Sequence, residues 1–359
     1  MLTHESVTAA MKTVNDPELH RDLVTLNMVK EVRIDGDDVR ITVELTTPAC
    51  PMKETIERDV RAALTKIGAS NIDVQFTAQV RAATGGAKRE MLPQVKNVIA
   101  VGAGKGGVGK STIAVNLAVA LQRDGATVGL LDGDVYGPSV PTLLGVKGMV
   151  PQVTTINGVQ KIIPLRVHGI YAMTIGLLVE PEKALIWRGP MAQGAFKQLL
   201  NDNTVWPELD YLIIDLPPGT GDVPLTMCQM LPINGAVVVA TPQQVALDDA
   251  IRAVRMFEQL KTPVLGMVEN MSYFVASDGT EHDIFGRGGT RNAAKQLNLP
   301  CLGEVPMFTQ LRVNSDAGKP HANFEGDPRL AEALTTMARA IAGQVSQKNL
   351  RRLPVMDLG

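Results

Sequence analysis

Apolar and polar side chains alternate in short runs along the first eighty residues. Residues 39–45 have a period of two, which is typical of a half-buried strand. The turn sequence Asp-Gly-Asp-Asp at residues 35–38 predicts a hairpin with the strand before it. Helical spacing over residues 56–67 predicts a helix, and alternation resumes over residues 72–76. This order of elements predicts a small α+β domain in residues 1–80.

The pattern changes after this domain. Residues 81–94 lose their periodicity and contain adjacent glycines and a proline, so we expect a linker there. From residue 95 onward, nearly continuous apolar runs are separated by helical segments. These runs are residues 98–101, 128–131, 211–214, 236–240, 264–268 and 301–305. Because strands of this kind are buried on both faces, we expect residues 95–359 to form an α/β domain with a doubly wound, mostly parallel sheet.

Composition and charge narrow the class of protein. The chain has 359 residues, 45% hydrophobic and 20% charged, which excludes wholesale disorder. A net charge of −2 argues against a dedicated nucleic-acid binder. No apolar run reaches the ~18 residues that a membrane helix needs, and the N-terminus does not resemble a signal peptide. Three cysteines are too few for a disulfide framework, which indicates a reducing compartment. Together with the net charge and the short apolar runs, this predicts a cytoplasmic protein that binds neither membrane nor nucleic acid.

The sharpest motif is a glycine-rich loop between a predicted strand and a predicted helix. The sequence GKGGVGKS, from Gly104, matches G-x-x-x-x-G-K-[ST]. Its glycines let backbone N–H groups surround phosphates, and the helix N-terminus adds partial positive charge. Lys110 is expected to neutralise the β and γ phosphates, and Ser111 to bind Mg²⁺. The alternative is a tight turn without a ligand. The predicted nucleotide-binding residues of the loop are Gly104, Lys105, Gly106, Gly107, Val108, Gly109, Lys110, Ser111 and Thr112.

Carboxylates end two of the predicted strands. Asp132 and Asp134 follow the strand at residues 128–131, and Asp215 follows the strand at residues 211–214. Doubly wound sheets bind ligands at the carboxyl ends of their strands, so these side chains can hold Mg²⁺ or orient a water. Asp215 fits an acid that contacts Mg²⁺ through water. The alternative is that all three acids only make polar turns.

The extra lysine in the loop carries a resemblance. The sequence from Lys105 to Ser111 resembles the deviant Walker A motif of the MinD/ParA-like ATPases. The resemblance implies that Lys105 reaches the partner's nucleotide across a homodimer, that Asp134 positions the attacking water, and that Asp132 supports the metal. It also implies that Asn270, whose amide can both donate and accept, contacts adenine. The alternatives are a solvated lysine and a turn-forming asparagine.

Several phrases narrow the resemblance further. They are DGDVYGPSVP (132–141), WRGPM (187–191), DLPPGTGD (215–222), ENMSYF (269–274) and DIFGRGG (283–289). Together they resemble the Mrp/ApbC branch of bacterial iron–sulfur cluster carrier ATPases, over nearly the whole chain. The first domain resembles the small domain of iron–sulfur assembly factors, with TTPACPMK (46–53) as its signature. The resemblance implies an ATPase that carries clusters, with assembly factors and apoprotein clients as partners.

Cys50 lies inside that signature and has a chemical reason to bind metal. Pro51 suits the first position of a helix, which would place Cys50 near the helix N-cap. A thiol at that location has a lowered pKa, so Cys50 is a candidate iron–sulfur ligand. The alternative is a small, half-buried capping residue. We interpret Cys228 and Cys301 as core thiols, because both lie among apolar residues.

One feature of the resembling family is missing. Mrp proteins often carry a C-x-x-C pair shortly after ENMSYF, and two pairs across a dimer give the four thiolates that a cluster uses. Here those positions hold Ala276 and either Asp278 or Gly279, and His282 is interpreted as a loop histidine. We therefore expect a labile cluster whose retention depends on Cys50.

Two other functions remain open from the sequence. One is a nucleotide-dependent partitioning or positioning ATPase that grips DNA or a membrane, which the near-neutral charge disfavours. The other is a regulatory switch that holds no cluster and uses its first domain to recruit assembly partners.

Overall fold

The structure is a computed structural model that describes residues 2–83, 91–134, 137–177, 194, 196–197, 199–200 and 203–351. The chain divides into two compact units, Met1–Arg81 with Ala342–Gly359, and Ala82–Ile341. The phrase WRGPM, at residues 187–191, lies outside the described residues, as do residues 84–90 of the expected linker. Within the described part, no helix combines the length and the apolar character needed to cross a membrane.

The first unit has the α+β character that the alternation predicts. Its elements are α1 (His4–Met11), β1 (Asn15–Asp16), β2 (Arg21–Asp22), β3 (Val29–Asp35), β4 (Asp38–Leu45), α2 (Lys53–Lys66) and β5 (Asn71–Ala78). β4 is the centre of a three-stranded sheet, antiparallel to β3 and parallel to β5. Its apolar residues are buried against α2, which presents Ile56 and Val60 to the same core. Gly36, with φ 61°, makes the tight turn between β3 and β4.

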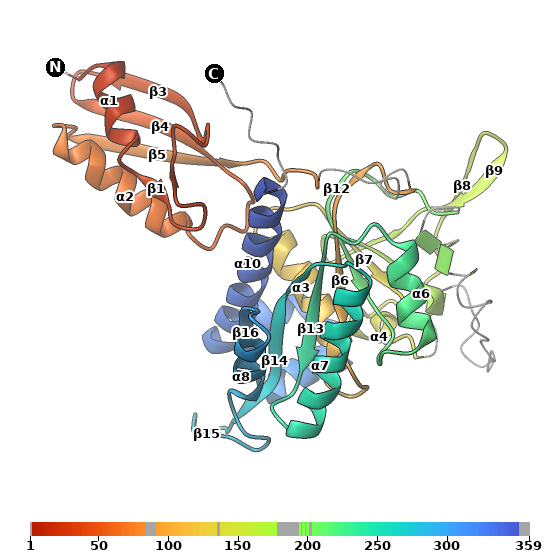
Figure 1. Ribbon diagram of the computed structural model, residues 1–359. Coiled ribbons are helices and arrows are strands. Elements are labelled where there is room, and N and C mark those ends of the chain that lie inside the picture. Colours follow the sequence, from red (N-terminus) through yellow and green to blue (C-terminus); the bar gives the residue numbers. More distant parts are fainter. Residues whose placement is uncertain are drawn as a thin grey trace. The chain divides into compact units, whose positions relative to one another are not determined.

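The second unit is larger and begins with β6. Its strands are β6 (Val95–Gly102), β7 (Val128–Asp132), β8 (Val153–Ile156), β9 (Val159–Ile162), β10 (Leu165–Val167), β11 (Ile170–Thr174), β12 (Leu209–Asp215), β13 (Gly235–Ala240), β14 (Val264–Val275), β15 (Glu281–His282) and β16 (Cys301–Met307). Its helices are α3 (Lys110–Arg123), α4 (Val140–Leu143), η2 (Ile175–Leu177), α6 (Asp222–Met230), α7 (Gln244–Gln259), α8 (Gly289–Gln296), α9 (Thr309–Asp316), η4 (Pro320–Phe324) and α10 (Pro328–Arg351), whose last turns belong to the first unit (Figure 1).

Nine of the described strands form one sheet, which confirms the expected doubly wound fold. The order is β10-β11-β7-β12-β6-β13-β14-β15, and β16 also pairs with β14. Neighbours from β11 to β14, and β16, run parallel, whereas β10 and β15 are antiparallel additions. β7 and β13 are buried along their whole lengths and β12 everywhere except at Asp210, as their apolar sequences predict.

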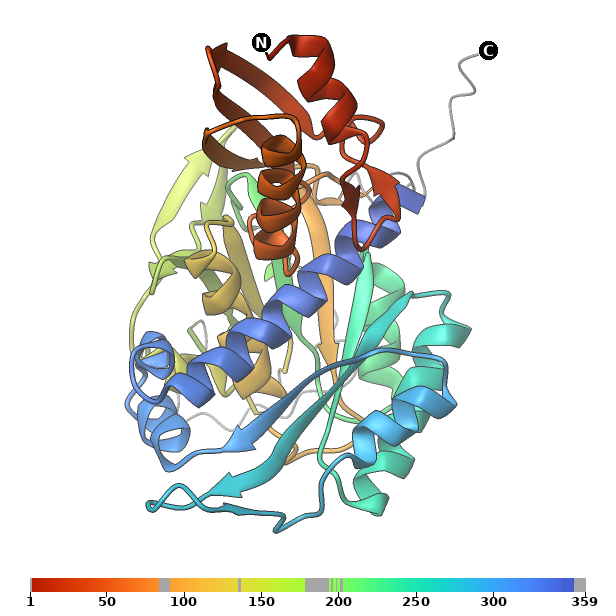
Figure 2. The same cartoon turned by 90° about the vertical axis from the view of Figure 1, so that its left-hand side faces the viewer.

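Helices cover both faces of this sheet (Figure 2). α3 packs against β6, β7 and β12, whereas α7 and α8 pack beside one another against β13, β14 and β16. α10 lies on the α3 side: Arg339 binds Asp124 at the end of α3 with N–O distances of 3.0 Å. Met337 of α10 packs so close to Gly303 of β16 that a Cβ on this glycine would come within 2.9 Å of it.

The strand register sets the position of the site. Asp215, the last residue of β12, pairs with Asp132 at the end of β7 on one side and with Val101 of β6 on the other. The glycine-rich loop follows β6 directly. Three neighbouring strands therefore end at one edge, with the loop beside the two carboxylates.

Candidate functional site

The glycine-rich loop has close contacts that require glycine at two positions. Gly104 lies against the backbone of α7, where a Cβ would collide with the carbonyl group of Asp249. Gly109 is the N-cap of α3 with φ 82°, and a Cβ there would collide with the amide of Asn270. Both contacts are with ordered, packed groups, so the sequence positions that the motif fixes are also sterically fixed.

The loop surrounds a pocket of about 370 Å³ at the N-terminus of α3. Residues from the loop, from the segment after β7 and from the segment after β12 line it: Lys105, Gly106, Gly107, Gly109, Lys110, Ser111, Thr112, Asp134, Ser139, Leu143 and Pro218. Val108 is buried beneath the loop. The backbone N–H groups of a helix N-terminus and two lysines at such a pocket suit a polyphosphate.

Lys110 is buried and contacts the acids of two strands. Its Nζ lies 2.5 Å from Oδ1 of Asp215 and 3.9 Å from Oδ2 of Asp134. It also donates to Oγ of Ser111 at 3.2 Å. A phosphate bound in the pocket would compete with Asp215 for this ammonium group, so the Lys110–Asp215 contact would have to loosen to receive it.

Asp132 and Asp215 are both fully buried, and their environments disfavour charge. Burial raises the pKa of Asp132 to about 8, with the charge of Asp215 acting in the same direction. Burial also raises the pKa of Asp215, although Lys110 opposes the shift. Asp132 accepts from the backbone N–H of Asp134 at 3.0 Å and from the hydroxyl of Thr174 at 3.0 Å. Sequence reasoning missed Thr174, since its strand carries no motif.

The acidic side chains pass a test for Mg²⁺. Oδ2 of Asp215 is buried and has no hydrogen-bond partner in the described chain. Near it are the hydroxyl of Ser111 and the carboxylate of Asp132 on the neighbouring strand, which are hard oxygen donors of the kind that Mg²⁺ prefers. A divalent cation would also offset the repulsion between the two buried carboxylates.

Asp134 faces the pocket from the β7 side. Only 8% of the residue is exposed, and its Oδ1 accepts from the backbone N–H of Gly137 at 3.2 Å. The structure thus brings Asp134 to the same pocket as Lys105 and Lys110, as the sequence predicts for a residue that acts on the phosphate end of a nucleotide.

Asn270 holds the loop. Its Nδ2 donates to the carbonyl of Val108 at 2.8 Å, in a buried position beneath Gly109. This contact was not expected from the sequence, where the residue is a candidate for reading adenine. The base contact stays a prediction, because the loop engages one of the two N–H donors of the amide and leaves its other groups for a ligand.

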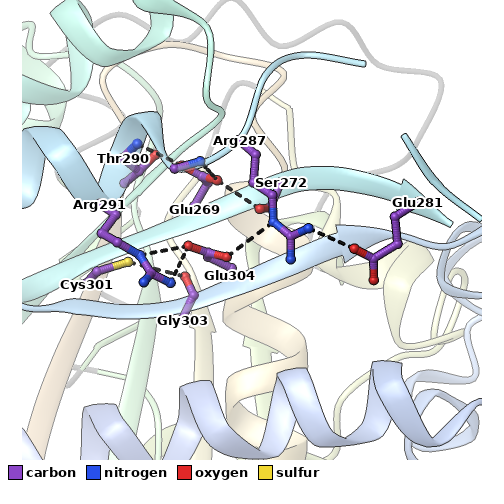
Figure 3. A network of polar contacts seen from close by, with 10 residues as sticks. Glu269, Ser272, Glu281, Arg287, Thr290, Arg291, Cys301, Gly303 and Glu304 are labelled. Atoms are coloured by element: carbon purple, nitrogen blue, oxygen red, sulfur yellow. Dashed lines mark hydrogen bonds and ion pairs between the residues drawn. The ribbon is translucent and has the colours of Figure 1, made fainter. Parts of the chain in front are cut away.

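Glu269, the neighbour of Asn270, was missed altogether. Figure 3 shows its buried carboxylate at the start of α8, where it accepts from the backbone N–H groups of Gly288 and Thr290 at 2.8 and 2.7 Å. It also accepts from the hydroxyl of Ser272 at 2.8 Å. A carboxylate at a helix N-terminus satisfies otherwise unpaired donors. The glycine pair before Thr290 is the sequence signal that could have indicated it.

An ion-pair network continues outward from this cap (Figure 3). Arg287 binds Glu281 at 2.8 Å and lies 3.9 Å from the centre of the Tyr273 ring. Glu304 of β16 binds Arg291 at 2.6 Å and lies 3.7 Å from Arg287. The network thus ties β15 and α8 to β16.

The positions where the resemblance led us to look for a C-x-x-C pair form a hairpin turn in this chain. β14 and β15 pair through Phe274–His282 and Val275–Glu281. Between them Ala276 accepts from the N–H of Gly279 at 2.9 Å, and the side chain of Asp278 accepts from the N–H of Thr280 at 2.9 Å. The ring of His282 stacks on the ring of Phe274. In the described part of the chain, His282 does not belong to a group of three potential metal ligands.

The cysteines lie on separate elements. Cys50 is buried in the core of the first unit, and α2 begins at Lys53 with Met52 as its N-cap. The expectation that Pro51 opens this helix is therefore wrong, and with it the helix-terminus argument for a lowered pKa at Cys50. Residues 51 and 52 form a turn, and the helix begins after them.

The other two thiols differ in burial. Cys228 is buried on α6, as expected. Cys301 opens β16 and is half-buried, and burial raises the pKa of its thiol. Within the described residues, no three His, Cys, Asp or Glu side chains are grouped so as to hold a metal ion.

The fold and the site together define a P-loop NTPase. Comparison with known proteins supplies the family. A model described as "NUBPL iron-transfer P-loop NTPase" matches residues 94–342, and one described as "Iron-sulfur cluster assembly protein" matches residues 4–76. The chain belongs to this iron-transfer P-loop NTPase family, and the resemblance drawn from its motifs is confirmed.

Individual relatives cover nearly the whole chain. The "Iron-sulfur cluster carrier protein" of Deinococcus radiodurans is 51% identical over 98% of this chain and 98% of its own length. The Escherichia coli K12 protein of the same description is 39% identical, over 94% of this chain and 91% of its own. A solved structure of an Archaeoglobus fulgidus nucleotide-binding protein in complex with ADP has a TM-score of 0.58 and 38% identity, covering 68% of this chain and 94% of that chain.

Proposed function

We propose that this protein is an ATP-binding and ATP-hydrolysing iron–sulfur cluster carrier that helps to assemble clusters and to transfer them to apoproteins. The proposal rests on one observation: this chain contains both a complete phosphate-binding site and an assembly-type domain. Relatives at 51% and 39% identity are described as cluster carriers, which supports the same role. The partners are assembly factors and apoprotein clients, in the reducing cytoplasm where thiols stay available.

Nucleotide binding is assigned to the loop and the start of α3. Backbone N–H groups from Gly106 to Thr112 surround the phosphates, and Lys110 neutralises the β and γ groups. Mg²⁺ is assigned to Ser111, Asp132 and Asp215, where it would neutralise charge that builds on the phosphates. Asn270 fixes Val108 and thereby holds the loop in its binding shape.

Hydrolysis is assigned to Asp134 and Lys105. Asp134 lies on the pocket wall opposite the loop and orients the attacking water. Lys105 is partly exposed at the mouth of the pocket, which suits a lysine that serves the nucleotide of the second copy in a homodimer. ATP binding closes the dimer in this scheme, and slow hydrolysis reopens it.

The cluster is cargo, and the chain itself offers few thiolates for it. A homodimer has two copies of each of three cysteines. Cys50 and Cys228 are buried and Cys301 is half-buried, so a dimer offers two partly exposed thiols, and four cluster ligands require a local opening, a partner protein or a small thiol. We therefore propose a labile, substoichiometric cluster, with Cys50 as its ligand from the assembly-type domain.

Anaerobic reconstitution with iron and sulfide tests this proposal. Iron and sulfide are counted per dimer, with Cys301→Ala as the matched control for Cys50→Ala. We expect low occupancy that falls further in Cys50→Ala, with ATP hydrolysis unchanged in both variants. A full, stable cluster that survives Cys50→Ala would contradict the ligand assignment.

The burial of the thiols favours a second candidate, a regulatory switch that recruits assembly partners without holding a cluster. Absence of iron and sulfide from the dimer under every reconstitution condition, with nucleotide-dependent capture of an assembly factor intact, would favour this switch. A DNA co-sedimentation assay checks the partitioning alternative, for which we expect no binding.

A further inference from the structure

Within the residues that the structure describes, backbone hydrogen bonds join the hairpin of β8 and β9 to residues 203–205 from its β9 side. Its two-residue turn, Asn157-Gly158, has φ values of 52° and 78°, as a type I′ turn requires. On the β9 side, Ile162 bonds to Asn203 at 2.5 Å and to Val205 at 2.9 Å. Among the strands that the structure describes, β8 pairs with β9 alone, and Figure 1 shows the hairpin projecting from the main sheet.

The outer edge of β8 presents backbone groups for pairing. A two-residue turn makes Ile156 and Val159 a hydrogen-bonded pair, and hydrogen-bonded pairs alternate along an antiparallel ladder. The register therefore turns the N–H and C=O groups of Val153 and Thr155 away from β9. An edge of this kind is a template for an added strand.

The hairpin also exposes apolar side chains. Six of the ten exposed large hydrophobic residues found in the described parts of the chain lie between residues 149 and 163. They are Met149, Val150, Val153, Ile156, Val159 and Ile163, with Val150 82% and Val153 57% exposed. Such a concentration on one small element marks an interaction site rather than scattered surface residues.

The chain segment that contains the hairpin carries charge of one sign. Residues 135–179 contain Lys147, Lys161 and Arg166 and no aspartate or glutamate, in a chain with 37 acidic residues and a net charge of −2. Lys147 and Arg166 are exposed just before and just after the hairpin. The segment that pairs with β9, residues 203–205, adds no charge.

We propose that the outer edge of β8 binds an extended segment of a partner protein in which acidic side chains alternate with apolar ones. The main chain of that segment pairs with Val153 and Thr155, its apolar side chains cover Val153 and Val150, and its acidic side chains meet Lys147 and Arg166. The open strand edge favours a peptide over a lipid surface, because lipids offer no backbone to pair with it. This site goes beyond the proposed carrier function and depends on neither nucleotide nor cluster.

A designed peptide tests the site on the full-length protein. The probe is a fluorescein-labelled peptide of alternating valine and glutamate, followed by fluorescence anisotropy, and its counterpart alternates valine and lysine. Three variants address the edge, the apolar surface and the charge: Thr155→Pro, Val153→Ser, and Lys147→Glu combined with Arg166→Glu. Proline at Thr155 removes an outward N–H and no bond of the β8–β9 ladder. Val313→Ser, an exposed valine on α9, is the matched control.

We expect the glutamate peptide to bind and the lysine peptide not to bind. Each hairpin variant should weaken binding by roughly tenfold, which corresponds to loss of one buried apolar or paired group. Val313→Ser should bind as the parent does, and every variant should retain nucleotide affinity, which shows that the second unit is folded. Binding should weaken as salt increases.

Several results would overturn the proposal. One is no binding of the glutamate peptide up to about 1 mM, the weak end of specific affinities. Another is equal binding of the two peptides, or full binding by Thr155→Pro and Val153→Ser. If the hairpin variants instead abolish binding to phosphatidylglycerol vesicles or self-association of the chain, while leaving peptide binding intact, the surface serves a membrane or a second copy and the peptide site is wrong.

Discussion

One substitution at Asn270 distinguishes between two roles for this residue, reading the base and supporting the loop. As a base reader it would distinguish adenine from guanine, and as a support for the loop it would act on every nucleotide equally. The structure argues for support, because the buried bond from its Nδ2 to the Val108 carbonyl is 2.8 Å long. Asn270→Ala leaves that carbonyl unpaired in the loop conformation that binds phosphate.

The cost can be estimated from this geometry. A buried acceptor that loses its partner costs about 1–3 kcal/mol. Because the cost falls on the binding-competent loop, it lowers nucleotide affinity by roughly 5- to 150-fold. We expect the same factor for ATP, ADP and GTP. A reader of adenine would instead lose affinity for ATP and leave the affinity for GTP where it was.

Titration of the three nucleotides by calorimetry decides between the roles. The matched control is Asn234→Ala, which removes a 2.6 Å bond from the N–H of Val98 near the opposite end of β6. It should lower thermal stability and leave nucleotide affinity unchanged. Unchanged affinity for all nucleotides in Asn270→Ala, or a loss confined to adenine nucleotides, would refute the support role.

Three further predictions concern the pocket. Lys110→Ala should abolish detectable ATP binding in a titration. Lys105→Ala should retain binding but reduce phosphate release by a factor on the order of 10³, as the loss of a residue that stabilises transition-state charge does. Equal loss of binding in both variants would exclude action of Lys105 in trans. Asp134→Ala should retain ATP affinity but accumulate an ATP-bound dimer on size exclusion, and normal turnover would exclude its role. Gly104→Ala should lower the free energy of unfolding by about 1–3 kcal/mol in denaturant titration through its clash with α7, whereas Gly106→Ala, with open space around it, should change it by less than about 0.5 kcal/mol.

The sequence predicts the large elements well because their signals are local. Continuous apolar runs mark β7, β12 and β13, and in all three strands these runs are buried. The loop motif and the acids at strand ends are also local, and strand register then brings Asp132 and Asp215 side by side. These features can be predicted from neighbouring residues in the sequence, without knowing which residues pack against them.

The features that were missed depend on residues far apart in the sequence. The Asn270–Val108 bond spans 162 positions, and the contact between Thr174 and Asp132 spans 42. Helix boundaries fail for a related reason. Proline suits the first helical position but also a preceding turn, and only the packing of the first unit decides that α2 starts at Lys53.

Adjacent residues of β14 join two parts of the second unit. Asn270 binds the carbonyl of Val108 in the nucleotide loop, and Glu269 binds the first backbone N–H groups of α8. Side chains of successive strand residues point to opposite faces, so the two bonds reach opposite sides of one strand. The strand that binds the loop at Val108 therefore also fixes the start of α8 and leads into the β14–β15 hairpin. Here the turn lacks thiols, and its hairpin is held by Arg287 and the acidic partners of that side chain.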